Sequence, residues 1–291
     1  MKLAIEFKQK VRDAIFTDRE NYGGNDGDYA KKLNIKPSIL SRLKKGELEK
    51  IISDTQWLLI ANELGVKLKD DNWKIARTVV YSNIEDNLNV CKEAGLSMIL
   101  VDDCGIGKTL CAKQITKNMK NAFYIDCSQA KTKQSFIRLL AKTLGVDNTG
   151  KYIDVKTAIK TYLIYLDKPL IVLDEAGDLD YNAFLELKEL WNAVPRECGW
   201  YMMGADGLRA KIDRGINCKK VGYAEIFDRY SNYIKLVPDG TEDKERFYKQ
   251  LIGDVASVNV KNKNDINRMI AACIKKEKGL RYLETLIKIN A

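Results

Sequence analysis

One short stretch, an apolar run that leads directly into a glycine-containing loop, constrains the fold of this chain more than any other feature. Ser97–Val101 (SMILV) has the character of a buried strand, Asp102–Thr109 (DDCGIGKT) follows at once, and a helical pattern starts at Leu110. In such a strand–loop–helix unit, successive backbone N–H groups and the positive end of the helix dipole point at one place. The segment therefore predicts an anion-binding loop at the edge of an α/β sheet.

The loop follows the G-x-x-x-x-G-K-T pattern of nucleotide-binding loops, except at its first position. Its backbone N–H groups would surround the phosphates of ATP, while Lys108 would neutralise the β and γ phosphates. The hydroxyl of Thr109 would ligate Mg²⁺. We therefore expect ATP and Mg²⁺ as cofactors. The predicted nucleotide-binding residues are Gly105, Ile106, Gly107, Lys108, Thr109 and Leu110.

Two acidic residues distinguish this loop from the pattern. Asp102 replaces the first glycine, and Asp103 adds a second carboxylate close to where the phosphates would lie. Because the first glycine mainly eases the turn, we expect ATP to bind, with an affinity weakened by charge repulsion. The alternative is a degenerate loop that no longer binds nucleotide.

A second motif supplies the acidic residues that hydrolysis of ATP requires. Leu170–Leu173 is typical of a buried strand, and Asp174 and Glu175 stand at its carboxyl end. Asp174 would hold Mg²⁺ through water, and Glu175 would polarise the attacking water molecule. Lys108, Asp174 and Glu175 are therefore predicted catalytic residues.

Strand-like and helical segments alternate around these two motifs. Such alternation is typical of a parallel sheet that is covered by helices on both faces. Further strands are predicted at Ala122–Asp126, Gly199–Gly204 and near Tyr233–Val237, and helices at Ser135–Leu144, Val155–Leu166 and Ala183–Val194.

Composition narrows the chemistry of the 291-residue chain. Histidine is absent, which excludes Ser-His-Asp and Cys-His catalysis and every zinc site that needs histidine. Lys and Arg number 49 against 40 acidic residues, and the net charge of +9 favours a polyanionic partner such as nucleic acid. No run approaches the roughly 18 apolar residues of a membrane span. Met1–Phe16 lacks the order of a secretory signal, so we expect a cytoplasmic protein.

The amino-terminal part has helix-turn-helix spacing. A helical pattern from Asp28, a turn and a second helix opened by Pro37 follow one another, and Asp54–Leu64 supplies a further helix. The segment resembles the repressor-type helix-turn-helix family over about Phe7–Val66. The alternative is a helical bundle that only packs against the rest of the chain or a partner. The predicted DNA-contacting residues are Ser38, Ser41, Arg42 and Lys44.

Together these motifs resemble the AAA+ ATPases, and among them the phage Mu B type of transposition protein. The resemblance implies an α/β P-loop AAA+ core with a parallel sheet and a small helical lid, preceded by an all-α helix-turn-helix domain. EIFDRY places Arg229 where this family carries a catalytic arginine finger, and GLRYLETLI places Arg281 where it carries a nucleotide-sensing arginine. Arg209 and Arg214 compete for the finger role. The family's polar sensor has no obvious counterpart, since only Asp206 lies close to the expected position.

The resemblance also implies domain boundaries and partners. The helix-turn-helix domain would span 1–70, a linker and the start of the AAA+ region 71–90, the core 91–238 and the lid 239–291. ATP would promote homo-oligomers, in the form of a helical filament on double-stranded DNA with little sequence specificity. The filament would deliver target DNA to a transposase and activate it, and hydrolysis would drive release. Core residues expected to face DNA, or alternatively to form an ordinary solvated lysine face, are Lys131, Thr132, Lys133 and Lys151.

Three other functions fit the same motifs. A helicase loader or insertion-sequence helper ATPase would share the core and bind DNA, but would retain a different partner. A nucleotide-regulated transcription factor would read a defined operator through its helix-turn-helix. A non-hydrolysing scaffold is suggested by Asp102 and by the unassigned polar sensor.

Overall fold

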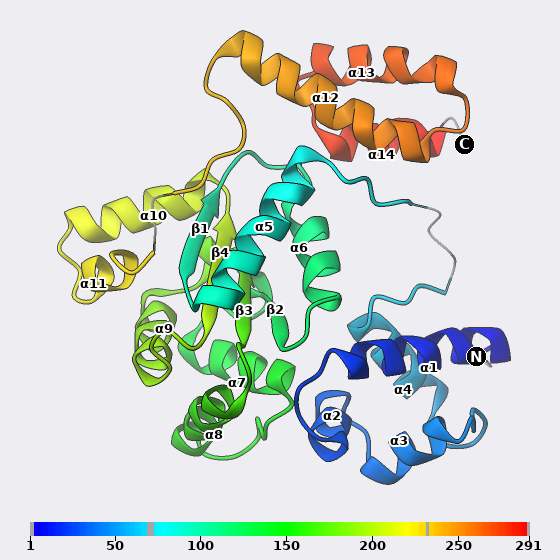
Figure 1. Ribbon diagram of the computed structural model, residues 1–291, viewed down its shortest axis with the longest axis vertical. Helices are drawn as coiled ribbons and strands as arrows, with labels where there is room; N and C mark the ends of the chain where they lie inside the picture. Colours follow the sequence, from blue (N-terminus) through cyan, green and yellow to red (C-terminus); the bar gives the residue numbers. More distant parts are fainter. Residues whose placement is uncertain (1–2, 69–72, 231–232, 290–291) are drawn as a thin grey trace.

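A parallel four-stranded sheet forms the centre of the molecule (Figure 1). The structure is a computed structural model, which describes residues 3–68, 73–230 and 233–289. The strands lie in the order β1-β4-β3-β2, and each neighbouring pair is parallel, which confirms the predicted α/β fold. The strands are β1 (Ser97–Val101), β2 (Ala122–Asp126), β3 (Leu170–Asp174) and β4 (Gly199–Gly204).

Side chains alternate between the two faces of the sheet because strands have a period of two residues. Leu100, Val172 and Tyr201 are buried in one hydrophobic cluster, whereas their neighbours Ile171 and Trp200 are buried in another. Helices α5 and α6 cover the first face, and α7 and α9 cover the second (Figure 1). The helices around the sheet are α5 (Val79–Ala94), α6 (Lys108–Lys117), α7 (Lys133–Leu144), α8 (Tyr152–Tyr165), α9 (Tyr181–Ala193), α10 (Asp206–Asn217) and α11 (Tyr223–Phe227).

The predicted core helices are confirmed, but each begins two or three residues earlier than its apolar pattern indicates. Polar caps set the starts of α7 and α9: the side chains of Thr132 and Asp180 accept hydrogen bonds from the backbone N–H groups of these helices. Likewise α6 begins at Lys108 rather than Leu110, directly after the left-handed Gly107. Within the described part of the chain, none of the helices is long and apolar enough to cross a membrane.

The strand predicted near Tyr233–Val237 is wrong. In its place Ile234 alone pairs with Leu100, next to β1. The ladder ends there because the N–H groups of Leu236 and Val237 donate to the carboxylate of Asp102, at 2.5 and 3.0 Å. The Asp102 side chain therefore accepts the backbone hydrogen bonds that a fifth strand would have donated to β1.

Four helices form the amino-terminal part of the chain. They bury Tyr29, Leu43 and Trp57, which are each 0% exposed, in a common interior. The predicted helix opened by Pro37 and the helix beginning at Asp54 are both present. We call 3–68 the helical module; its helices are α1 (Ile5–Glu20), α2 (Asp26–Lys32), α3 (Pro37–Lys44) and α4 (Asp54–Glu63).

The helical module is docked firmly on the sheet domain. The hydroxyl of Tyr22 donates to the carbonyl of Leu144 at 2.6 Å, and the N–H of Asn121 donates to the carbonyl of Asn21 at 2.9 Å. The approach is close, since a Cβ atom on Gly145 would lie 2.3 Å from the Tyr22 hydroxyl. The interior of the module and one face of the sheet belong to one hydrophobic cluster.

A separate bundle of three helices follows the sheet domain and lies over one end of the sheet (Figure 1). Its own cluster includes Ile252, Met269 and Leu283. Within the segment predicted as a linker and the start of the AAA+ region, 71–90, helix α5 begins at Val79, and residues 69–72 lie outside the described ranges. We call 73–78 the connector; its Lys74 exchanges two hydrogen bonds with the side chain of Asn259. The bundle comprises α12 (Thr241–Asn259), α13 (Ile266–Lys275) and α14 (Leu280–Ile289).

Docking of the helical module should depend on Tyr22. Tyr22→Phe removes one buried hydrogen bond and should lower the free energy of unfolding by about 1 kcal/mol. Tyr22→Ala also leaves a cavity and should cost about 3–5 kcal/mol. Urea denaturation measures both values, with Tyr165→Phe as the control because Tyr165 is 84% exposed. A Tyr22→Ala protein as stable as that control would contradict the tight docking.

Candidate nucleotide site

The loop between β1 and α6 has the backbone that its sequence predicts. Gly105 and Gly107 adopt φ values of +79° and +98°, in the left-handed region that favours glycine. No atom lies within 4 Å of a Cβ built on Gly105, so the backbone there is open to a close ligand. Gly107 caps α6 without a side-chain hydrogen bond, which leaves the first N–H groups of that helix for an anion.

Lys108 is held inside this loop. Its ammonium group donates to the carbonyls of Asp102 and Asp103 at 2.8 and 2.7 Å, and the residue is only 9% exposed. Burial lowers the pKa of Lys108, and nearby carboxylates, foremost that of Asp102, act in the opposite direction. The loop therefore concentrates one positive charge where phosphate groups would bind.

The next two residues turn toward solvent. Thr109 and Leu110 are both exposed in the first turn of α6. An exposed hydroxyl at this position suits a Mg²⁺ ion that arrives with a nucleotide, and Thr109 would hold that ion together with Asp174. The ion would neutralise charge on the phosphates.

Asp174 is fixed at the carboxyl end of β3. It is 2% exposed, and its carboxylate accepts hydrogen bonds from the hydroxyl of Tyr124 at 2.5 Å and from the N–H of Glu175 at 2.9 Å. Tyr124 lies on the adjacent strand β2, whose last residue, Asp126, is in register with Asp174. Sequence reasoning missed Tyr124, because nothing local distinguishes it from other strand residues.

Glu175 follows Asp174 in the left-handed backbone conformation. Its φ of +49° is uncommon outside glycine and costs energy, which the surrounding structure must supply. Desolvation raises the pKa of Glu175, the Asp174 carboxylate adds to this, and Lys108 acts against it. The side chain is exposed beside Asp174. A carboxylate in such a place can accept a proton from an attacking water molecule.

The acid that replaces the first glycine has a structural role. Asp102 is 1% exposed, and its carboxylate accepts hydrogen bonds from the N–H groups of Asp103, Leu236 and Val237. This carboxylate thus joins the start of the nucleotide loop to the chain that leads into the helical bundle. Its negative charge is spread over three backbone donors.

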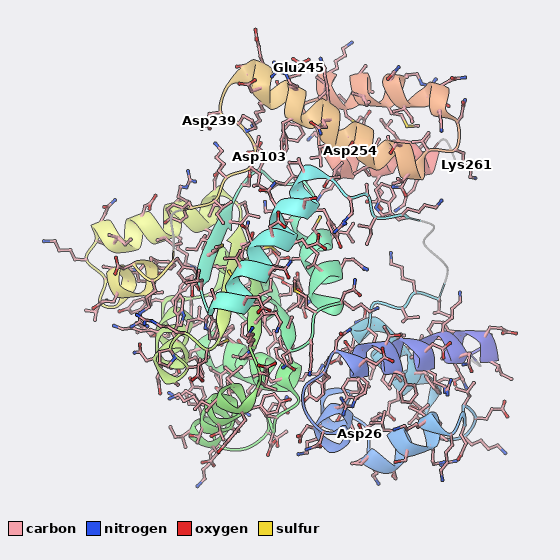
Figure 2. All side chains as sticks on the ribbon, in the orientation of Figure 1. Asp26, Asp103, Asp239, Glu245, Asp254 and Lys261 are labelled. Carbon is pink, nitrogen blue, oxygen red and sulfur yellow. The ribbon has the colours of Figure 1, made fainter. Side chains whose placement is uncertain are left out.

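The second acid of the loop binds the helical bundle. The carboxylate of Asp103 lies 2.7 Å from the ammonium group of Lys244 and accepts a hydrogen bond from the Tyr248 hydroxyl at 2.9 Å, both on α12. Figure 2 shows Asp103 where the sheet domain meets this helix. Desolvation alone would raise the pKa of Asp103, but these two partners hold it below its ordinary value.

A backbone contact also links the bundle to the loop. The N–H of Leu280, the first residue of α14, donates to the carbonyl of Gly105 at 3.0 Å. Arg281 follows directly and is exposed. The predicted sensing arginine therefore sits one residue from a direct contact with the nucleotide loop, although its role stays a prediction.

The three arginines considered for the finger role lie away from α6. Arg229 is exposed and follows α11, which packs on α9 and α10, and its guanidinium lies 5.9 Å from the ring centre of Trp191. Arg209 stacks on Tyr233 at 5.0 Å, and Arg214 is exposed on α10. Helix α11 packs on the opposite face of the sheet from α6, and the finger role of Arg229 stays a prediction.

The carboxyl end of β4 offers little polar chemistry. Met203 and Gly204 end the strand, and Asp206 opens α10 as an exposed residue. A Cβ on Gly204 would lie 3.0 Å from the side chain of Leu208, so the strand end is packed closely against α10. The polar sensor therefore remains unassigned.

Residues predicted to contact DNA are exposed on α3. Ser38, Ser41, Arg42 and Lys44 all face solvent, while the opposite side of this helix is buried. Arg42 pairs with Glu47 at 2.7 Å, a bond that an incoming phosphate would have to replace. This arrangement leaves a polar helix face free of packing, and its binding to DNA stays a prediction.

Three of the core residues predicted to contact DNA have local partners, among them Lys133, whose ammonium group lies 3.9 Å from the Glu186 carboxylate. Lys131 lies 2.9 Å from Asp178, and Thr132 forms a reciprocal capping pair with Ser135 at the start of α7. Lys151 is exposed ahead of α8. Thr132 therefore has a structural role as the N-cap of α7. DNA contact by Lys131, Thr132, Lys133 and Lys151 remains a prediction.

Comparison with known proteins identifies the central segment. Residues 91–212 match the protein family described as AAA domain. The matched segment contains the glycine loop after β1 and the acidic pair Asp174 and Glu175 at the end of β3. Both motifs lie at the carboxyl ends of the parallel strands. No curated protein matches the chain.

The structural role of Asp102 leads to a stability prediction. Asp102→Gly restores the glycine of the general pattern but leaves the buried N–H of Val237 without its acceptor. It should therefore lower the free energy of unfolding by about 2 kcal/mol. Asp102→Asn keeps one acceptor oxygen and should lose less. Urea denaturation of both variants measures the difference, and an Asp102→Gly protein as stable as wild type would refute the anchoring role.

Proposed function

With residues 91–212 forming an AAA-type ATPase domain, we propose that the protein binds duplex DNA with little sequence preference and assembles with copies of itself when ATP is bound. One arrangement carries this proposal. The exposed polar face of α3 belongs to a module that packs against the ATPase domain through buried contacts and is not joined to it by a flexible linker alone. A conformational change at the nucleotide loop can therefore alter the position of the surface that would bind DNA.

Hydrolysis would use groups already in position. Lys108 would supply positive charge to the β and γ phosphates, and Thr109 and Asp174 would hold Mg²⁺. Glu175 would accept the proton of the attacking water molecule. Since phosphoryl transfer depends on placed charges more than on covalent chemistry, these four side chains are sufficient for a basic hydrolytic step.

Self-assembly is supported by the position of Arg229. The residue is exposed and follows α11, a helix that packs on the other face of the sheet from α6. An arginine in this place can reach the γ-phosphate of a neighbouring molecule, so the active species would be an oligomer, in the form of a filament along DNA.

Delivery of the bound DNA to a transposase, with release on hydrolysis, is the role that the resemblance to phage Mu B-type proteins suggests. Residues 261–291 carry eight basic against three acidic residues, and this basic segment would contact either DNA or a transposase. A loader or helper ATPase of another recombination or replication system would retain a replicative helicase instead, so affinity capture with each candidate partner separates the two roles.

Hydrolysis should depend on Glu175 and on pH. Glu175→Gln should lower kcat for ATP by about 10²–10⁴-fold and still permit ATP binding, because the amide cannot accept the proton. In wild type, kcat should rise as pH increases through the raised pKa of Glu175, because only the carboxylate is active. Phosphate release across pH measures both effects. Glu197→Gln, at an exposed site, serves as the control. A Glu175→Gln protein with the kcat of wild type would show that Glu175 is not the general base.

DNA binding should require α3 and respond to ATP. Random-sequence duplexes should bind cooperatively with ATP, and filaments should persist in Glu175→Gln. Combined Arg42→Ala and Lys44→Ala should weaken binding and reduce the dependence of log affinity on log salt by about one to two. Fluorescence anisotropy and negative-stain microscopy measure these properties, with Lys168→Ala as the control. Discrete complexes of the size of an operator, formed with the same affinity with and without ATP, would instead indicate a transcriptional regulator.

A further inference from the structure

The chain turns sharply directly after Glu175, the predicted general base. Glu175 has a φ of +49°, and such a backbone conformation persists only where the surrounding structure holds it. Its carbonyl accepts a hydrogen bond from the N–H of Asp178 at 3.0 Å. The N–H of Leu179 donates in the same way to the carbonyl of Ala176 at 3.2 Å, and both of these residues are buried. We call 176–180 the β3 turn.

A lysine from α10 binds two carbonyl groups of the β3 turn. The ammonium group of Lys211 donates to the carbonyl of Gly177 at 2.8 Å and also to the carbonyl of Leu179. Lys211 is half-buried, and this burial lowers its pKa, whereas the carboxylates of Asp178 and Asp180 act in the opposite direction. Hydrogen bonds from an ammonium group are stronger than those between neutral groups. Lys211 therefore restrains the main chain of the turn at two points.

Helix α10 packs closely against the β3 turn. A Cβ atom built on Gly177 would lie 3.4 Å from the backbone of Leu208, one turn of helix before Lys211. The ammonium group of Lys211 also lies 5.7 Å from the ring centre of Phe184 on α9. Lys211 thus reaches the turn from a helix that already packs against it, and a neighbouring ring helps to fix its position.

A second cation at the β3 turn makes a different kind of contact. Lys131 lies 2.9 Å from the carboxylate of Asp178, and both residues are exposed. An exposed ion pair contributes little to stability, because water and salt screen the two charges. Lys211 instead binds the main chain, whose path sets the direction in which the side chain of Glu175 points. The restraint on Glu175 therefore comes from Lys211 more than from Lys131.

We propose that Lys211 is a positioning residue for ATP hydrolysis, which holds the β3 turn so that the carboxylate of Glu175 faces the attacking water molecule. This inference rests on the proposed ATPase function and adds to it a residue outside the two nucleotide motifs. Without Lys211 the turn gains freedom, and Glu175 can leave its left-handed conformation. Misplacing a reacting group by about 1 Å can lower a rate about a hundredfold.

Lys211→Met tests this role in the full chain, with phosphate release from Mg²⁺-ATP measured in the presence of duplex DNA. Methionine has a similar length but cannot donate, so kcat should fall about tenfold to a hundredfold. The Kd for a non-hydrolysable ATP analogue should stay that of wild type. Lys211→Arg keeps the charged donors and should recover most of the lost rate. Lys120→Met, at an exposed lysine before β2, is the matched control and should keep the kcat of wild type.

The pH dependence of kcat gives a readout that a loss of stability alone would not change. In wild type, desolvation is the first cause of the raised pKa of Glu175. A carboxylate released from its position is better solvated, so in Lys211→Met this pKa should fall toward its ordinary value. The rise of kcat should therefore occur at lower pH than in wild type, and it should end at a lower plateau.

A double mutant separates positioning from general damage to the fold. Adding Lys211→Met to Glu175→Gln should lower kcat no further, because the group that Lys211 positions is already absent. Circular dichroism checks that each variant is folded, and Lys211→Gln, whose amide can donate to one carbonyl, replaces a Lys211→Met protein that is not.

Two results would overturn the inference while the ATPase function stands. One is a Lys211→Met protein with the kcat and pH dependence of wild type. The other is a loss of kcat on adding Lys211→Met to Glu175→Gln that equals its loss in the wild-type background. A wild-type protein that releases no phosphate from ATP with duplex DNA present would overturn the proposed function, and this inference with it.

Discussion

The candidate nucleotide site at the carboxyl ends of the strands is organised around the buried ammonium group of Lys108. Two carbonyls of its own loop hold it. Four carboxylates belong to the same loop or to the carboxyl end of β3, and three of them have dedicated partners: Asp102 binds backbone donors, Asp103 binds α12 and Asp174 binds a tyrosine. Only Glu175 of the four is exposed. The arrangement balances the cation and still leaves one carboxylate available for chemistry.

Asp102 and Asp103, the two acids that depart from the common loop pattern, join the nucleotide loop to the helical bundle. Through Asp102 the loop fixes the segment that leaves the sheet, and through Asp103 it fixes the first helix of the bundle. Together with the contact between Leu280 and Gly105, they make the nucleotide loop the meeting point of the sheet domain and the bundle. A phosphate group entering the loop would therefore act on both parts at once.

Buried strands were predicted most accurately from the sequence, whereas the starts of the core helices were predicted two or three residues late. The strands at Ser97–Val101 and Gly199–Gly204 have the predicted bounds, because continuous apolar runs are unambiguous in a buried parallel sheet. The strand near Ile234 was predicted wrongly, because its ladder is interrupted by a carboxylate more than a hundred residues earlier in the chain. The contact of Tyr124 with Asp174 could not be predicted either, since it depends on the register of two strands that are far apart in sequence.

We propose that the loop around Lys108 binds and hydrolyses ATP, and that duplex DNA stimulates the hydrolysis. The most direct measurement is phosphate release from Mg²⁺-ATP by the purified chain, with and without duplex DNA, beside Lys108→Ala. Release by wild type that DNA stimulates, and background release by Lys108→Ala, is the predicted result. Equal release by the two proteins, or none from wild type even with DNA present, would contradict the claim.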